Sequence, residues 1–116
     1  MTTPNYPSLY PDNADCQWLI SVRQSHRVRV RFIDFQLESD CDYDRVRLYD
    51  GSTTSSSVLG TYCGRRSAFT VVSSGSQMLV VFHSDGSDRY RGFRFNWTQT
   101  LEDGDNAVAC ELKSTS

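Results

Sequence analysis

The sequence predicts an all-β protein, built either as a sandwich of two sheets or as a barrel. Short runs of residues alternate between apolar and polar with a period of two, and helical periodicity is hard to find. Turn-forming pairs such as Asp12-Asn13, Asp50-Gly51 and Ser74-Gly75 separate these runs. At 116 residues the chain has the length of one domain with one core.

The alternation predicts about six to ten strands. The first covers residues 16–22, and in the next, 27–32, arginines alternate with Val28, Val30 and Phe32. Residues 45–49 and 68–72 continue the pattern. Residues 78–82 are apolar at every position, which predicts a central strand covered from both sides. In the last strand, 93–98, three aromatic residues share one face and three polar residues share the other.

Composition excludes two classes of protein. The formal net charge is −2, with eleven arginines and one lysine, so a strongly basic nucleic-acid binder is not the leading interpretation. No apolar run approaches the roughly 20 residues of a membrane-spanning helix. The start of the chain also lacks the apolar segment of a signal peptide, so we expect Met1 to precede an excised fragment.

The four cysteines, at positions 16, 41, 63 and 110, favour disulfides over zinc or redox chemistry because no Cys-x-x-Cys pair occurs. Disulfides indicate an oxidising compartment. Asn96-Trp97-Thr98 is an N-glycosylation sequon whose asparagine lies on the polar face of its strand. Both features are typical of a secreted or extracellular chain, glycosylated at Asn96.

Carboxylates gather around the segment Cys41-Asp42-Tyr43-Asp44, and Glu38 and Asp40 lie just before it. Like charges held close together repel, so a positive group must lie among them. Spacing alone favours nearby arginines, of which Arg45, Arg47, Arg89 and Arg91 are candidates. A metal ion or a binding partner is the alternative.

Four phrases in the chain together resemble a CUB domain, the extracellular module of complement and tolloid-type proteases, neuropilins, cubilin and spermadhesins. They are TPNYPSLYPDNADCQWLI, FIDFQLESDCDYDRVRLYDG, LGTYCG and VVFHSDGSDRYRGFRF, and the resemblance covers about residues 3–98. It implies a CUB-type β-sandwich of two mainly antiparallel sheets, which binds other molecules and is not catalytic. We expect residues 1–100 to form the domain and residues 101–116 a tail or linker.

The resemblance also implies disulfides. Cys41 and Cys63 match the second disulfide of the family, whereas the cysteine that normally pairs with Cys16 lies upstream of the Asn-Tyr-Pro motif and is missing here. Cys16 then has either no partner or Cys110, and we expect Cys110.

A calcium-binding subset of the family carries acidic residues at matching positions. Calcium takes six to eight oxygen ligands, several of them from carboxylates. The ligands that the resemblance implies here are Glu38, Asp44, Asp85, Asp88 and the backbone carbonyl of Ser87. Tyr6 resembles a tyrosine that orients the acidic ligands from outside the metal's own shell.

The function that the resemblance implies is calcium-dependent protein binding, within a larger secreted or cell-surface mosaic protein. A lysine or arginine of an extracellular protein ligand would reach Glu38, Asp44 and Asp85, with Tyr6 or Tyr90 packing against its stem. The alternative is spermadhesin-like binding of a sulfated glycan or another polyanion. It would use an arginine-rich strand face formed by Arg23, Arg27, Arg29 and Arg31. Against this alternative, these arginines can instead pair across strands with acidic residues.

An enzyme is not indicated. His83-Ser84-Asp85 contains the residue types of a hydrolytic triad, but adjacent residues of a strand point to opposite faces. The chain also lacks a Gly-x-Ser-x-Gly motif. Neither His26 nor His83 has a second histidine or cysteine at the spacing of metal ligands.

Overall fold

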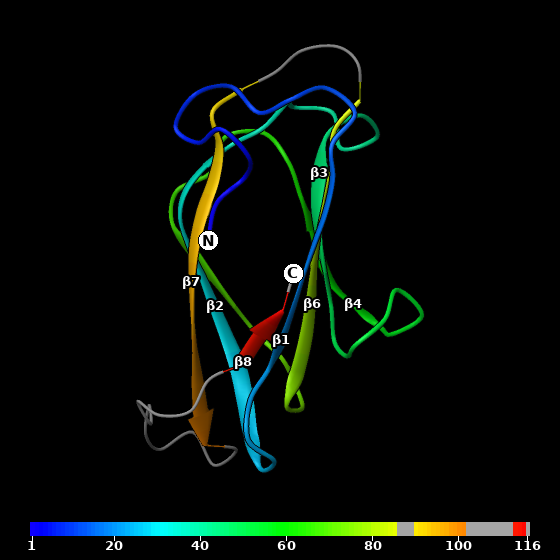
Figure 1. Cartoon of the computed structure of the whole chain (residues 1–116), viewed down its shortest axis with the longest axis vertical. Helices are drawn as coiled ribbons and strands as arrows, with labels where there is room; N and C mark the ends of the chain where they lie inside the picture. The colour runs from blue at the N-terminus through cyan, green and yellow to red at the C-terminus, as the bar shows by residue number, and fades with distance from the viewer. Residues whose placement is uncertain (86–89, 102–112, 116) are drawn as a thin grey trace.

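The computed structural model describes residues 1–85 and 90–100 and the backbone of residues 101 and 113–115. Eight strands run through this part of the chain, which confirms the all-β prediction (Figure 1). They are β1 (Asp15–Ser21), β2 (His26–Gln36), β3 (Arg45–Tyr49), β4 (Val58–Tyr62), β5 (Phe69–Val72), β6 (Gln77–His83), β7 (Gly92–Leu101) and β8 (Lys113–Thr115). Within these described residues, no helix has the length and hydropathy needed to cross a membrane.

The strands form two sheets that face each other (Figure 1). One has five strands in the order β4-β3-β6-β1-β8, and the other has three in the order β5-β2-β7. Every paired strand runs antiparallel to its neighbour. The predicted sandwich of two antiparallel sheets is therefore confirmed. Strand β6 lies in the middle of the larger sheet, as its apolar run predicts.

The core lies between the sheets and is rich in aromatic residues. Phe32 of β2 and Phe93 and Phe95 of β7 are fully buried, with Phe32 and Phe93 ring centroids 5.3 Å apart. Trp18 of β1 completes the packing from the opposite sheet, edge-on to Phe95 at 5.6 Å. Burying each such side chain stabilises the fold by about 2 to 3 kcal/mol. These aromatics therefore hold the sheets together, and Trp97 packs against the same core while partly exposed.

The disulfide that the family resemblance predicts between Cys41 and Cys63 is present. Cys41 and Cys63 are bonded, with their Cα atoms 5.3 Å apart. Next to the bond, the Gly64 N–H donates to the Glu38 carbonyl at 2.9 Å, and the Leu37 N–H donates to the Gly64 carbonyl at 2.8 Å. These contacts attach the β2–β3 connection to the segment that follows β4. Gly64 has a φ of +73°, a conformation that favours glycine.

Cys16 is a free cysteine among the described residues, and burial raises the pKa of its thiol. Cys110, its predicted partner, lies outside the described residues, so a bond between them stays a prediction. Part of the expected tail contributes a strand, because Lys113 of β8 pairs with Ser21 of β1. The domain boundary at residue 100 also stays a prediction.

Candidate metal centre

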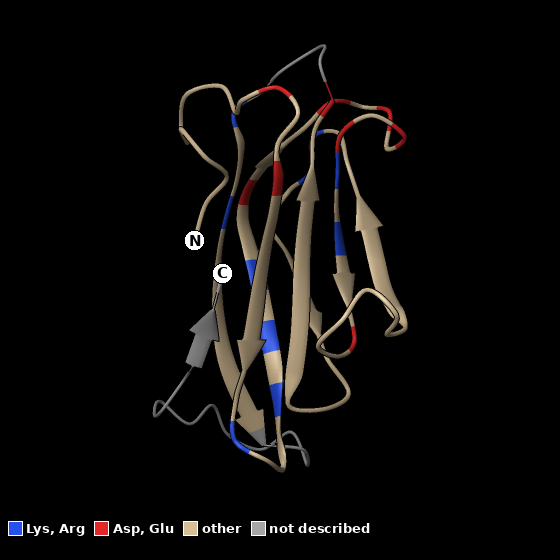
Figure 2. Cartoon of the chain, turned by 45° about the vertical axis from the view of Figure 1, so that its right-hand side comes forward, with Lys and Arg blue, Asp and Glu red and all other residues tan. Residues whose placement is uncertain are grey.

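Three carboxylates meet at one end of the sandwich. Glu38 follows β2, Asp44 immediately precedes β3, and Asp85 lies two residues after β6. One carboxylate oxygen from each lies within 4.8 Å of the other two. Figure 2 shows most of the described acidic residues in the upper half of the molecule, and one series of basic residues along the lower half of β2. The predicted ligands Glu38, Asp44 and Asp85 are thus brought together.

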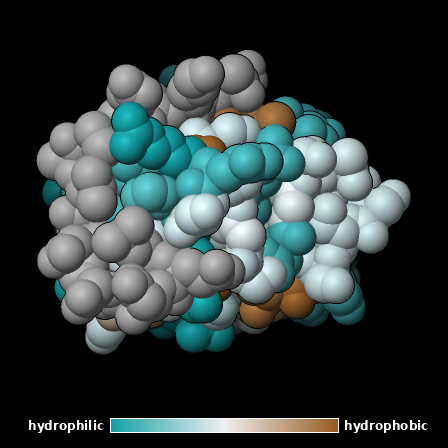
Figure 3. Space-filling model, turned by 90° about the horizontal axis from the view of Figure 1, so that it is seen from below, coloured by the Kyte–Doolittle hydropathy of each residue, from teal (hydrophilic) through white to brown (hydrophobic). Residues whose placement is uncertain are grey.

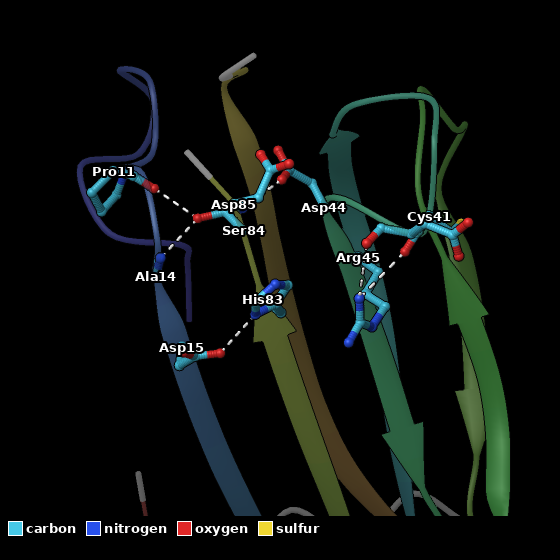
Figure 4. A network of polar contacts seen from close by, with 10 residues as sticks. Pro11, Ala14, Asp15, Cys41, Asp44, Arg45, His83, Ser84 and Asp85 are labelled. Carbon is cyan, nitrogen blue, oxygen red and sulfur yellow. Dashed lines mark hydrogen bonds and ion pairs between the residues drawn. The ribbon is translucent and has the colours of Figure 1, made fainter. Parts of the chain in front are cut away.

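The register of the larger sheet explains two of these positions. Arg45 of β3 lies opposite His83 of β6 in an antiparallel pair, so the chain enters β3 where it leaves β6. Asp44 and Asp85 therefore meet at the same end of the sheet. The Asp85 N–H donates to Asp44 Oδ1 at 2.9 Å and holds the two segments together (Figure 4).

Two of the three carboxylates are buried. Asp44 is 0% exposed and Glu38 is 9% exposed, whereas Asp85 is half-buried. Burial raises the pKa of the Asp44 carboxyl above its ordinary value, although its hydrogen bonds favour the charged form. An anion in such a place is costly unless a positive charge accompanies it. The site therefore has the character of a cation-binding site.

Tyr10, and not the predicted Tyr6, is hydrogen-bonded to the acidic cluster. The fully buried Tyr10 donates its hydroxyl hydrogen to Asp44, and burial together with this bond raises the pKa of Tyr10. The predicted residue, Tyr6, instead donates to Asp34 Oδ2 at 2.5 Å. Arg91 Nη2 also donates to Asp34, at 2.8 Å.

The two tyrosines occupy equivalent sequence contexts, because each is followed by proline within the phrase NYPSLYP. A turn separates them: the Ser8 N–H donates to the Asn5 carbonyl at 2.7 Å. Beyond it, the Tyr10 N–H donates to the Tyr90 carbonyl at 3.0 Å and places Tyr10 in the core. The second Tyr-Pro pair in the sequence could have indicated Tyr10 as a candidate. Only the folded chain shows which of the two tyrosines turns inward.

The arginines expected to neutralise the cluster mostly have other partners. Arg45 Nη1 donates to the carbonyls of Cys41 and Asp42, both at 3.5 Å. Arg47 Nε donates to Thr61 Oγ1 at 2.9 Å, and Arg91 pairs with Asp34. Ser87, Asp88 and Arg89 lie outside the described residues. The described contacts of Arg45, Arg47 and Arg91 are thus with groups other than the carboxylates of Glu38, Asp44 and Asp85.

Aromatic and apolar side chains next to the cluster differ in their exposure. Tyr90 is half-buried and packs against the core, which limits the contact predicted for it. Tyr43, which the sequence did not single out, is 49% exposed next to Asp44. Leu9, beside Tyr10, is 51% exposed. Seen from the opposite end, the described surface is a mixture of hydrophilic and near-neutral residues, with small separate hydrophobic areas (Figure 3).

The side chains of His83, Ser84 and Asp85 turn to different partners (Figure 4). His83 Nδ1 lies 2.8 Å from Asp15 Oδ1. The Ser84 hydroxyl donates to the Pro11 carbonyl at 2.8 Å and accepts the Ala14 N–H at 2.9 Å. The three residues therefore do not form a catalytic triad, in agreement with the sequence analysis.

The arginines of the alternative interpretation separate into two groups. Arg27, Arg29 and Arg31 lie on the outer face of the three-stranded sheet, because the alternate β2 residues Val28, Val30 and Phe32 are buried. Arg23 lies outside β2, in the β1–β2 connection. The cross-strand neighbours of the three β2 arginines are uncharged. They are Thr70 and Val72 of β5 and Asn96, Thr98 and Thr100 of β7.

Comparison with known proteins gives the family. The CUB domain family matches residues 1–97. Tolloid-like protein 2 of Mus musculus is 38% identical over 96 residues, which cover 81% of this chain and 10% of that protein. The chain thus spans about a tenth of the length of this relative. It belongs to the CUB domain family, whose members are interaction modules and are not themselves catalytic.

Solved structures that contain CUB domains have a similar fold. The CUB1-EGF-CUB2 domain of human MASP-1/3 is similar with a TM-score of 0.79 and 33% identity, over 87% of this chain and 40% of that one. The MASP-1 CUB2 domain bound to Ca²⁺ is similar with a TM-score of 0.69 and 27% identity. That match covers 84% of this chain and 88% of the other. CUB domains are β-sandwiches, in agreement with the two sheets described above.

Proposed function

We propose that this CUB domain binds calcium through Glu38, Asp44 and Asp85, and that the loaded site binds a basic side chain of an extracellular protein. The observation that carries the proposal is the convergence of three carboxylate oxygens within 4.8 Å, two of the residues being buried. The similar MASP-1 CUB2 domain is described as bound to Ca²⁺, which supports the same chemistry here.

The donor set fits a hard divalent cation. Carboxylate oxygens are the ligands that calcium prefers, and six to eight oxygens complete its shell. Glu38, Asp44 and Asp85 supply part of this shell. Asp88 and the backbone carbonyl of Ser87, which lie beyond the described residues, are proposed to supply more. When bound, the ion offsets the mutual repulsion of the acids, while Tyr10 holds Asp44 in position.

The loaded site would still attract cations. Glu38, Asp44, Asp85 and Asp88 together carry about four negative charges, against two on the ion. A lysine ammonium or an arginine guanidinium of a partner can pair with the remaining charge, and Tyr43 is exposed beside Asp44 for contact with its stem. Exposed ion pairs contribute at most about 1 kcal/mol each, so one module alone should bind weakly.

An extracellular setting is part of this proposal. The Cys41–Cys63 disulfide is stable in an oxidising compartment. One similar solved structure is described as the full extracellular region of zebrafish Gpr126/Adgrg6, with a TM-score of 0.78 and 34% identity. We infer that the chain is a module of a larger secreted or cell-surface protein.

Two measurements test the proposal. Isothermal titration with calcium should show one site, which disappears in Asp85→Ala. Nuclear magnetic resonance with N-acetyl-lysine amide should then shift amide signals of residues 38–44 and 85, only when calcium is present. N-acetyl-norleucine amide is the matched control because it lacks the ammonium. Equal shifts with both compounds, or with EDTA present, would place the recognition surface elsewhere.

A second candidate function is binding of a sulfated glycan by Arg27, Arg29 and Arg31. The observation that favours it is the uncharged character of their cross-strand neighbours, since acids at those positions would have neutralised the arginines. Arg29 and Arg31 are exposed. Elution from a heparin column at a salt concentration that falls in Arg29→Gln and Arg31→Gln would support this function.

A further inference from the structure

The outer face of the three-stranded sheet presents a straight row of arginines. Arg27, Arg29 and Arg31 alternate along β2, so the row spans about 13 to 14 Å at about 3.4 Å per residue. Arg31 makes one weak bond on this face, from Nη1 to Thr70 Oγ1 at 3.3 Å. Arg27 is partly buried, and its Nε, which has no hydrogen-bond partner among the described residues, lies out of reach of solvent. The exposed Arg29 and Arg31 are therefore the arginines of this row that can donate most readily to an anionic ligand.

The glycosylation sequon lies on this same face. Asn96 pairs directly opposite Arg31, and Thr98 pairs opposite Arg29, in the antiparallel register of β7 with β2. Asn96 is exposed, as predicted, whereas the adjacent Phe95 is fully buried. A glycan on Asn96 would therefore emerge beside the arginine row.

We propose that N-glycosylation of Asn96 controls access of a linear sulfated polysaccharide to Arg27, Arg29 and Arg31. The proposal rests on the second candidate function above, and it adds a modification that switches that function off. The sequon is complete because Trp97 and not proline separates Asn96 from Thr98. The modification transfers an oligosaccharide from a lipid-linked pyrophosphate donor to Asn96: the bond from the first sugar to the pyrophosphate oxygen breaks, its C1 bonds to the side-chain nitrogen, and the lipid pyrophosphate leaves with the proton that this nitrogen loses.

The spacing of side chains on the paired strands β2 and β7 explains how a glycan on Asn96 would block the arginine row. Side chains directly opposite on paired strands have Cβ atoms about 4.5 to 5.5 Å apart, and diagonal neighbours are about 7 to 8 Å apart. The first sugar on Asn96 would thus lie next to Arg31, and Arg29 is the diagonal neighbour of Asn96. The block is steric, so an uncharged glycan is sufficient and changes in salt concentration do not relieve it.

Charge complementarity favours a sulfated polysaccharide as the ligand of the arginine row. A row of guanidinium groups along one extended strand matches a chain that carries negative charge at repeated positions along its length. Sulfated polysaccharides have this character, whereas a lone anion would use one arginine at a time. The acidic end of the sandwich lies away from this row, along the opposite half of the molecule (Figure 2).

The experiment compares glycosylated and glycan-free protein on immobilised heparin. The chain is secreted from mammalian cells, and peptide mapping measures the occupancy of Asn96. Asn96→Gln and Thr98→Ala both remove the sequon, while Thr98→Ser changes the same residue and keeps it. We expect the glycan-free variants to bind heparin at least tenfold more tightly than the occupied parent and Thr98→Ser.

Two controls show where the effect arises. In the Asn96→Gln background, Arg29→Gln and Arg31→Gln should each weaken heparin binding by about two- to fivefold. In the same background, Ser52→Asn completes a sequon with Thr54 in the exposed β3–β4 connection of the other sheet. A glycan there should leave heparin binding unchanged.

The possible results distinguish failure of control by the glycan from failure of the second candidate function. Equal binding by occupied parent and Asn96→Gln overturns control by the glycan but leaves the second candidate function intact. An unoccupied Asn96 in the secreted parent overturns the modification itself. Absence of binding in every form overturns the second candidate function as well.

Discussion

Replacing the buried Asp44 with asparagine separates calcium binding from folding. Asp44 is 0% exposed and contributes one of three carboxylate oxygens that lie within 4.8 Å of one another. At that separation, two unit charges repel by about 3 kcal/mol at an effective dielectric constant of about 20. Asparagine keeps the shape and can still accept the Asp85 N–H. Without calcium, Asp44→Asn should therefore be as stable as the parent or more stable.

With calcium, the same substitution should have the opposite effect. An ion at a hundredfold excess over its Kd stabilises the native state by about 2.7 kcal/mol, which raises the Tm by about 10 to 20 °C. Removing one member of a buried charge pair costs about 3 kcal/mol or more, a loss of over a hundredfold in affinity. The gain for Asp44→Asn would then fall to about 0.4 kcal/mol, or about 2 to 3 °C.

The assay is thermal unfolding by circular dichroism, with calcium and with EDTA. Asp42→Asn is the matched control, because Asp42 is an exposed carboxylate two residues away in the same connection and lies outside the cluster. It should retain the calcium response of the parent. If Asp44→Asn retains that response too, the assignment of the metal centre is refuted.

Three further predictions concern the surroundings of the site. Tyr10→Phe should weaken calcium binding by about 10- to 100-fold in a calorimetric titration, whereas Tyr6→Phe should not, because only Tyr10 bonds to Asp44; equal effects would contradict this assignment. The hydrogen bond from Tyr6 lowers the pKa of Asp34 below its ordinary value of 3.8. The charged Asp34 carboxylate therefore stabilises the folded state fully above pH 3.8, and this stabilisation is lost as the pH falls through the lowered pKa. The difference in Tm between parent and Asp34→Asn should thus shrink between pH 5 and pH 2, and a constant difference would count against this linkage. Replacing Cys41 and Cys63 together by alanine should cost about 3 kcal/mol in urea unfolding, and a much smaller loss would show that this loop is already ordered without the bond.

The alternation in the amino-acid sequence was sufficient to predict an all-β fold, either a sandwich or a barrel, and the family resemblance selected the sandwich. The period-two alternation reflects which side chains face the core, and this depends only on the geometry of a strand. The row of arginines along β2 and the exposed Asn96 followed from the same rule. The acidic ligands and the Cys41–Cys63 bond came from the family resemblance, which carries information that periodicity lacks.

Tertiary structure decided the contacts between segments far apart in the chain. Tyr6 and Tyr10 each precede a proline, and only the turn between them and the contact with Tyr90 determine that Tyr10 reaches Asp44. The placement of Asn96 opposite Arg31 likewise depends on the register of β7 against β2. A one-residue slip would move every side chain of a strand to the other face, and the packing of the whole core excludes it. Such contacts result from burial shared by many residues, so no single segment specifies them.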